Sequence, residues 1–105
     1  MDENYKAIYR ILRTLERSMD ADEFDFHVIG HELLGISRQR WQHILEMLSD
    51  DGYIKGIQVI KNIGGNVEVY ATDPKITLKG LEYLSENTMM KRMQKAAKGI
   101  VDLIP

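Results

Sequence analysis

The sequence predicts an α+β fold that is mainly α-helical: a winged helix-turn-helix with a two-stranded antiparallel wing and additional C-terminal helices. Three observations predict it. Apolar residues recur at helical spacing in most of the chain, a glycine-containing turn separates two helical segments near residue 35, and strand-like segments follow Gly52. Since 105 residues suffice for one modest core, we expect a single winged-helix domain over residues 1–105.

The first twenty residues are expected to form an amphipathic helix. Apolar residues recur there every three or four positions and define the face expected to be buried: Tyr5, Ile8, Ile11, Leu12, Leu15 and Met19. The other face carries Lys6, Arg10, Arg13, Glu16 and Arg17. The acidic segment from Asp20 to Asp25 breaks this pattern, so we expect a loop there.

A short second helix is expected to begin at Asp25 or His27. It should end at Gly35, because glycine adopts the left-handed conformation of a helix C-terminus without a steric penalty. The residues expected to face the core are Ile29, Leu33 and Leu34.

A third helix should follow the turn and run to about Asp50. Ser37 is its expected N-cap, since a serine hydroxyl can accept a hydrogen bond from an unpaired amide of the first turn. Its apolar stripe consists of Trp41, Ile44, Leu45 and Leu48. Together with the second helix and the intervening turn, it gives the helix-turn-helix form.

A β-hairpin is expected next, because YIKGIQVI and VEVYA are rich in β-branched and aromatic residues and KNIGGN between them favours a reversal. Pro74 is expected to prevent the second strand from continuing, since proline has no amide hydrogen to donate to the ladder. A fourth helix then begins in ITLKGLEYLSEN, with Thr77 as N-cap and the following leucines inward: Leu78, Leu81 and Leu84.

The tail, Thr88 to Ile104, is predicted to be a fifth helix with a short coiled-coil-like seam. We expect residues 88–105 to dock on their own domain, with homodimerisation as the alternative. The seam residues are Met90, Met93, Ala97, Ile100 and Ile104. Basic residues lie off the seam: Lys91, Arg92, Lys95 and Lys98.

Composition restricts the classes of function. Without cysteine the chain has no disulfides or thiolate metal sites, which fits a reducing compartment. The N-terminus MDENYKAIYR lacks a signal-peptide core, and no apolar run approaches the roughly 18 residues of a membrane span, so we expect a cytoplasmic protein without membrane association. The net charge of −2 argues mildly against nucleic acid, although an acidic protein can still present a basic face.

The start of the third helix has side chains suited to double-stranded DNA. Arginine can bind guanine and glutamine adenine in the major groove, while the first turn and the wing can contact phosphate. The candidate DNA-binding residues are Ser37, Arg38, Gln39, Arg40, Gln42, His43, Lys61 and Asn62. The same residue types are also ordinary on an exposed helix face, and the acidic far half of this helix, with Glu46, Asp50 and Asp51, would repel phosphate.

No catalytic constellation, cofactor site or metal site is expected. His27 and His31 share a helical face near Asp25 and Glu32, but two histidines without an obvious third ligand are weak grounds for zinc. We expect one of these histidines to be partly packed and the other solvated. NIGGN lacks the lysine and the strand-to-helix setting of a phosphate-binding loop, so a turn is the better interpretation.

Three motifs, YKAIYRILRTLE, RWQHILEMLSDDGYIKGI and ITLKGLEYLSENTMMKRMQKAAKGI, cover nearly the whole chain in order. In these motifs the sequence resembles the YjcQ family, small bacterial and bacteriophage-associated proteins with a winged-helix fold. The resemblance implies the fold and a phage or prophage setting, and it brings no binding residues.

Two functional hypotheses follow. The first is a winged-helix DNA-binding protein that regulates transcription of phage or host genes. The alternative is a winged-helix protein-interaction or dimerisation module that binds no nucleic acid, which the acidic total charge and the Met-rich tail favour.

Overall fold

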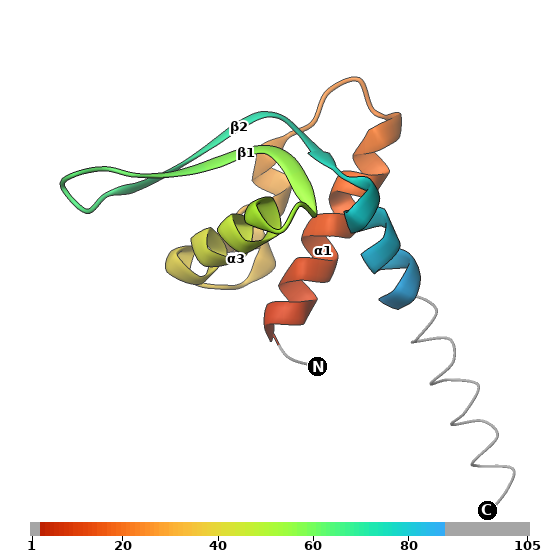
Figure 1. The fold of residues 1–105 in the computed structure, drawn as a ribbon, viewed down its shortest axis with the longest axis horizontal. Helices are drawn as coiled ribbons and strands as arrows, with labels where there is room; N and C mark the ends of the chain where they lie inside the picture. Colours follow the sequence, from red (N-terminus) through yellow and green to blue (C-terminus); the bar gives the residue numbers. More distant parts are fainter. Residues whose placement is uncertain (1–2, 88–105) are drawn as a thin grey trace, which may run out of the picture.

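The computed structural model describes residues 3–87. It has the predicted α+β architecture, mainly helical with one two-stranded antiparallel sheet. The order of elements is consistent with a winged helix-turn-helix (Figure 1). In chain order the elements are α1 (Glu3–Arg17), η1 (Ser18–Asp20), η2 (Phe26–Ile29), α2 (His31–Leu34), α3 (Arg38–Asp50), β1 (Ile54–Lys61), β2 (Val67–Ile76) and helical residues 78–87.

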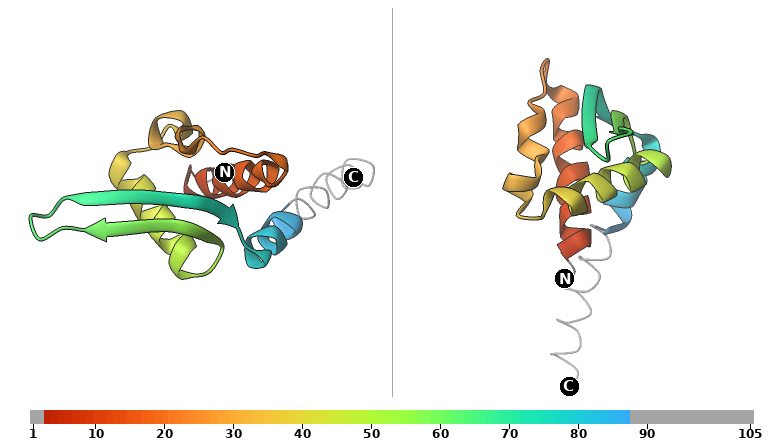
Figure 2. Two further views of the ribbon diagram at one scale, coloured as in Figure 1. Left: turned by 90° about the horizontal axis from the view of Figure 1, so that it is seen from above. Right: turned by 90° about the vertical axis from the view of Figure 1, so that its left-hand side faces the viewer.

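The hairpin of β1 and β2 projects from the body on the same side of α1 as α3, and residues 78–87 lie on the other side (Figures 1 and 2). Helix α3 packs on β1, and α1 contacts both β2 and η2. The core between them is entirely apolar. It consists of Ala7, Ile11, Leu12, Leu15, Ile29, Leu34, Trp41, Ile44, Leu45, Leu48, Ile54, Ile57, Ile76 and Leu84.

Helix α1 buries the middle of its predicted apolar face and leaves both ends exposed. Tyr5 and Met19, expected inside, are exposed. Tyr5 lies about 120° around the helix axis from Ile11, at the margin of the buried face. The α-helix ends at Arg17, and the tighter 3-10 turn Ser18–Asp20 takes Met19 off the apolar stripe.

The predicted second helix is two short pieces, η2 and α2, joined at Gly30. The Asp25 carboxylate caps η2 by accepting the His27 amide hydrogen at 3.0 Å. Leu34 is 9% exposed and Leu33 is 59% exposed, so the prediction that both face inward is wrong for Leu33. In the short helix α2, Leu33 points about 100° away from Leu34, and this direction leads to solvent.

The turn and α3 form as predicted. Gly35 has a left-handed φ of 71°, and the Ser37 hydroxyl accepts the Arg40 amide hydrogen at 3.1 Å. Trp41 is 8% exposed, and its Nε1 donates to the Ile29 carbonyl at 2.8 Å. This bond links α3 to η2 and fixes how α3 is rotated about its own axis.

The second strand continues past Pro74, so the prediction that proline ends it is wrong. Lys55 pairs with Lys75 and Ile57 with Ala71, which leaves residues 72–74 opposite the single residue Gly56. Pro74 therefore lies in a bulge, where the ladder needs no amide hydrogen from it. Gly56 has a φ of 81°, and a Cβ there would lie 2.6 Å from backbone oxygens of the bulge.

Thr77 caps the helical residues 78–87 as predicted. Its hydroxyl accepts the Gly80 amide hydrogen at 3.2 Å and donates to the Gly52 carbonyl at 2.5 Å. Leu84 is buried and Leu81 partly buried, whereas Leu78, expected inside, is exposed. Leu78 lies about 120° around the helix from Leu84, away from the core.

The predicted fifth helix over residues 88–105 lies outside the described residues, and so does its seam of Met90, Met93, Ala97, Ile100 and Ile104. Within residues 3–87, no helix is both long and apolar enough to cross a membrane.

We predict that Trp41→Phe lowers the free energy of unfolding by about 1–3 kcal/mol, because it removes the indole donor from the buried Ile29 carbonyl and part of a packed ring. Urea unfolding followed by circular dichroism measures this. Ile63→Ala, at a fully exposed position, is the control and should change stability by no more than about 0.5 kcal/mol. Equal midpoints for Trp41→Phe and wild type would contradict the proposed role of the bond.

We predict that Gly56→Ala destabilises the protein by about 2 kcal/mol or more, since alanine is strained at this φ and its Cβ would clash with the bulge. The matched control is Gly64→Ala in the wing turn, where no heavy atom lies within 4 Å of the new Cβ and φ is not left-handed. Thermal unfolding of both variants compares them. Similar melting temperatures would show that the bulge yields without loss of stability.

Candidate nucleic-acid interface

The first turn of α3 presents polar side chains to solvent beside the wing end of the hairpin. The side chains of Arg38 and Gln39 are exposed and make no hydrogen bond or ion pair with any of residues 3–87. The Ser37 hydroxyl already accepts an amide hydrogen of this turn. Ser37 therefore shapes the start of the helix, and the side chains available to an outside partner are those of Arg38 and Gln39.

A groove joins this turn to the wing. Arg38, Gln39 and Gln42 line it from α3, residues 65–68 line it from the hairpin, and its volume is about 400 Å³. Gln42 is half-buried, and its amide donates to the Val67 carbonyl at 3.4 Å. The fold thus brings the start of α3 and the wing, which are far apart in sequence, to one surface.

Arg40 and His43 lie elsewhere. The Arg40 guanidinium donates to the Asn4 side-chain oxygen at 2.7 Å, which directs it towards α1. Arg40 and His43 line a separate groove of about 600 Å³ between α1 and α3, together with Asn4, Tyr5, Ile8, Ile44 and Met47. Arg38 and Arg40 differ by about 160° around the helix axis, so the two arginines cannot serve one surface.

The acids nearest the α3–wing groove already have partners. Lys61 Nζ lies 3.7 Å from the Glu46 carboxylate. Glu68 accepts the hydroxyl hydrogen of Tyr70, and this hydrogen bond raises the pKa of Tyr70. Both contacts are exposed to solvent, so they moderate the negative charge beside the groove and do not remove it.

The tip of the wing carries an apolar residue that the sequence analysis did not select. Ile63 is fully exposed, between Asn62 and Gly64. The Asn62 amide donates to the Asn66 carbonyl at 2.8 Å, and the Gly65 amide donates to the Asn62 carbonyl at 3.0 Å, which closes the turn. The signal in the sequence that could have identified this residue is an isoleucine inside an otherwise polar turn.

His27 and His31 differ as expected: one is packed and the other is solvated. The His31 ring packs against Trp41 with ring centroids 5.9 Å apart, while the His27 side chain is 95% exposed and lies 3.2 Å from the Asp25 carboxylate. That hydrogen-bonded carboxylate has a pKa below its ordinary value, chiefly because it accepts the His27 amide hydrogen. Across residues 3–87, no three histidine, aspartate or glutamate side chains gather as metal ligands do.

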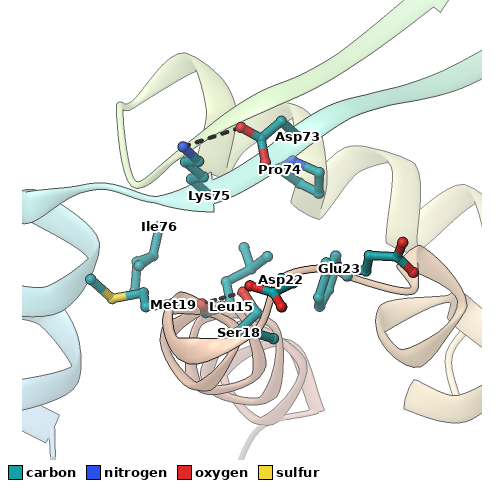
Figure 3. Close-up of a pocket in the computed structure, with 11 residues that line it drawn as sticks. Leu15, Ser18, Met19, Asp22, Glu23, Asp73, Pro74, Lys75 and Ile76 are labelled. Carbon is teal, nitrogen blue, oxygen red and sulfur yellow. Dashed lines mark hydrogen bonds and ion pairs between the residues drawn. The ribbon is translucent and has the colours of Figure 1, made fainter.

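A further hollow, of about 450 Å³, lies between the end of α1 and the bulged part of β2 (Figure 3). Asp22 and Glu23 approach it from the acidic segment, and Lys75 forms an ion pair with Asp73 across 3.1 Å on the opposite side. Met19 lines this hollow together with Leu15 and Ile76. Met19 is therefore exposed to this hollow and does not lie in the core. The residues that line the hollow do not form a recognisable catalytic group.

A family model described as YjcQ protein matches residues 9–103, nearly the whole chain. None of the curated proteins and none of the solved structures matches it.

We predict that Ser37→Ala lowers the free energy of unfolding by about 1 kcal/mol, because the Arg40 amide loses its acceptor at the start of α3. Ser37→Asp should retain near wild-type stability, since an aspartate oxygen can accept the same hydrogen and favours the positive end of the helix dipole. Urea unfolding of the three proteins measures this. If alanine and aspartate behave alike, the hydroxyl is not a significant cap.

Proposed function

The chain belongs to the YjcQ family, and we propose that it binds double-stranded DNA through the first turn of α3 and the wing, as a regulator of phage or host transcription. The observation that supports this most directly is the groove in which Arg38 and Gln39 face the hairpin. In this proposal α3 enters the major groove with its first turn foremost, and the hairpin reaches the adjacent groove or backbone.

Arg38 is the central residue of the proposal. Its guanidinium has no partner among residues 3–87, so binding DNA would break no bond that it makes within them. A guanidinium can donate two hydrogen bonds to guanine or to phosphate, and the neighbouring Gln39 can bind adenine in the same way. Arg38 and Gln39 therefore supply base recognition in this proposal, and Gln42 holds the wing beside them.

The wing tip suits a narrow groove. Asn62 and Asn66 carry amides that can donate to minor-groove acceptors, and the glycines between them add no side-chain bulk. Ile63 adds an apolar side chain of the type that DNA-binding proteins place against or between base pairs. Lys61 would contribute to phosphate contact after exchanging its weak ion pair with Glu46.

We predict that the wild-type protein binds mixed-sequence duplex DNA at low salt and that Arg38→Ala weakens binding about tenfold, equivalent to ~1.4 kcal/mol. If Arg38 contacts a phosphate, the negative slope of log affinity against log salt also becomes shallower by about one. Fluorescence anisotropy of a labelled duplex, titrated at several salt concentrations, gives both quantities.

Arg40→Ala is the matched control, because it removes the same charge from the same helix at a position where the side chain is hydrogen-bonded to Asn4. We expect its affinity to stay within about twofold of wild type. Absence of binding at low salt would reject the proposal, and an equal loss in both variants would reject the assignment of Arg38.

A second candidate function is a protein-interaction module. An apolar hollow of about 440 Å³ lies over Trp41, lined by Phe26, Gly30 and Leu33 among others. Leu33 and the nearby Val28 are exposed, and exposed apolar side chains around a concave surface are typical of protein contacts. If no DNA binding is observed at low salt, this surface becomes the preferred site of function.

A further inference from the structure

Four basic side chains form a straight stripe along α1. Lys6, Arg10, Arg13 and Arg17 follow one another at spacings of four, three and four residues, so they fall within about 60° of one another around the helix axis. All four are exposed, and the stripe is about 16 Å long at the rise of an α-helix. It lies on the side of α1 away from the buried residues Ile11 and Leu15.

The stripe is positive within a part of the chain that is negative overall. Residues 3–87 contain ten lysines and arginines against fourteen aspartates and glutamates, and four of those ten cations stand in this one row. Arg13 forms an ion pair with Glu16 at 3.0 Å. The side chains of Lys6, Arg10 and Arg17 make no hydrogen bond or ion pair with other residues of the described region.

The composition of the stripe favours a phosphate backbone over a protein partner. Stable protein interfaces usually have an apolar centre with few charges, and no apolar side chain interrupts this row. Isolated exposed ion pairs between proteins stabilise little. A nucleic acid backbone offers a regular row of phosphates, and each lysine or arginine that neutralises one gains from counterion release.

The stripe and the α3–wing groove face different directions. The buried sides of α1 and α3 meet in one core, which leaves their exposed sides turned away from each other. One straight duplex seated on α3 and the wing therefore does not reach the middle of the stripe. We propose that the α1 stripe binds the phosphate backbone of a second DNA duplex, so that one chain bridges two duplexes. This inference rests on the proposed function of the α3–wing surface.

The test is a bridging assay with the full chain. Beads that carry one duplex are mixed with a second, labelled duplex and the protein at low salt, and the captured label is measured. Wild type should capture the second duplex. Arg10→Ala with Arg17→Ala should reduce capture about tenfold and make the negative slope of log capture against log salt shallower by about two. Affinity of the double variant for a single duplex, measured by anisotropy, should change by no more than about twofold.

Lys55→Ala with Lys75→Ala is the charge-matched control, since both lysines are exposed, pair with each other across the hairpin and lie outside the α1 stripe, and capture should remain near wild type. Sedimentation of each protein without DNA accompanies the assay and should show the same monomer for wild type and the stripe variant. Single-duplex binding without bridging would overturn this inference and leave the proposed function standing. Bridging that survives loss of the stripe, or a dimer that the stripe variant dissociates, would also overturn it.

Discussion

The burial of Trp41 is the constraint on which the candidate interface depends. The indole lies in the core and donates its one hydrogen to the Ile29 carbonyl, so its position is fixed by packing and by a directional bond together. A buried carbonyl without a donor is unfavourable by about 1–3 kcal/mol, which resists any rotation of α3 that would break this bond. With Trp41 fixed, every other side chain of α3 has a set direction.

That fixed rotation divides the polar residues of α3 between two surfaces. Arg38, Gln39 and Gln42 face the wing, whereas Arg40 turns towards α1 and is held by Asn4. Residues adjacent in sequence therefore serve different purposes: one arginine is free to meet an outside partner and another joins two helices. A short polar run on a helix is for this reason a poor guide to which residues act together.

The bulge opposite Gly56 has a comparable effect on the hairpin. Three residues of β2, including Pro74, lie opposite one residue of β1. This irregularity in the ladder separates the base of the hairpin from its projecting part. At the base of the hairpin, Ile54 pairs with Ile76, and both residues are buried in the core. The projecting part of the hairpin carries the wing beside the start of α3. A regular ladder without the extra residues would change which strand residues face α3.

The element types, the turn at Gly35, the caps at Ser37 and Thr77, and the buried stripe of α3 could be predicted from the sequence, because each follows from local spacing or from hydrogen bonds within a few residues. The family resemblance, carried by near-continuous motifs, was confirmed as well. Tertiary structure decided which of Leu33 and Leu34 is buried, why Pro74 sits inside a strand, and which polar residues share a groove with the wing. These depend on contacts between segments far apart in the chain, such as Trp41 with Ile29 or Gln42 with Val67, and helical periodicity carries no information about which neighbour a face will meet.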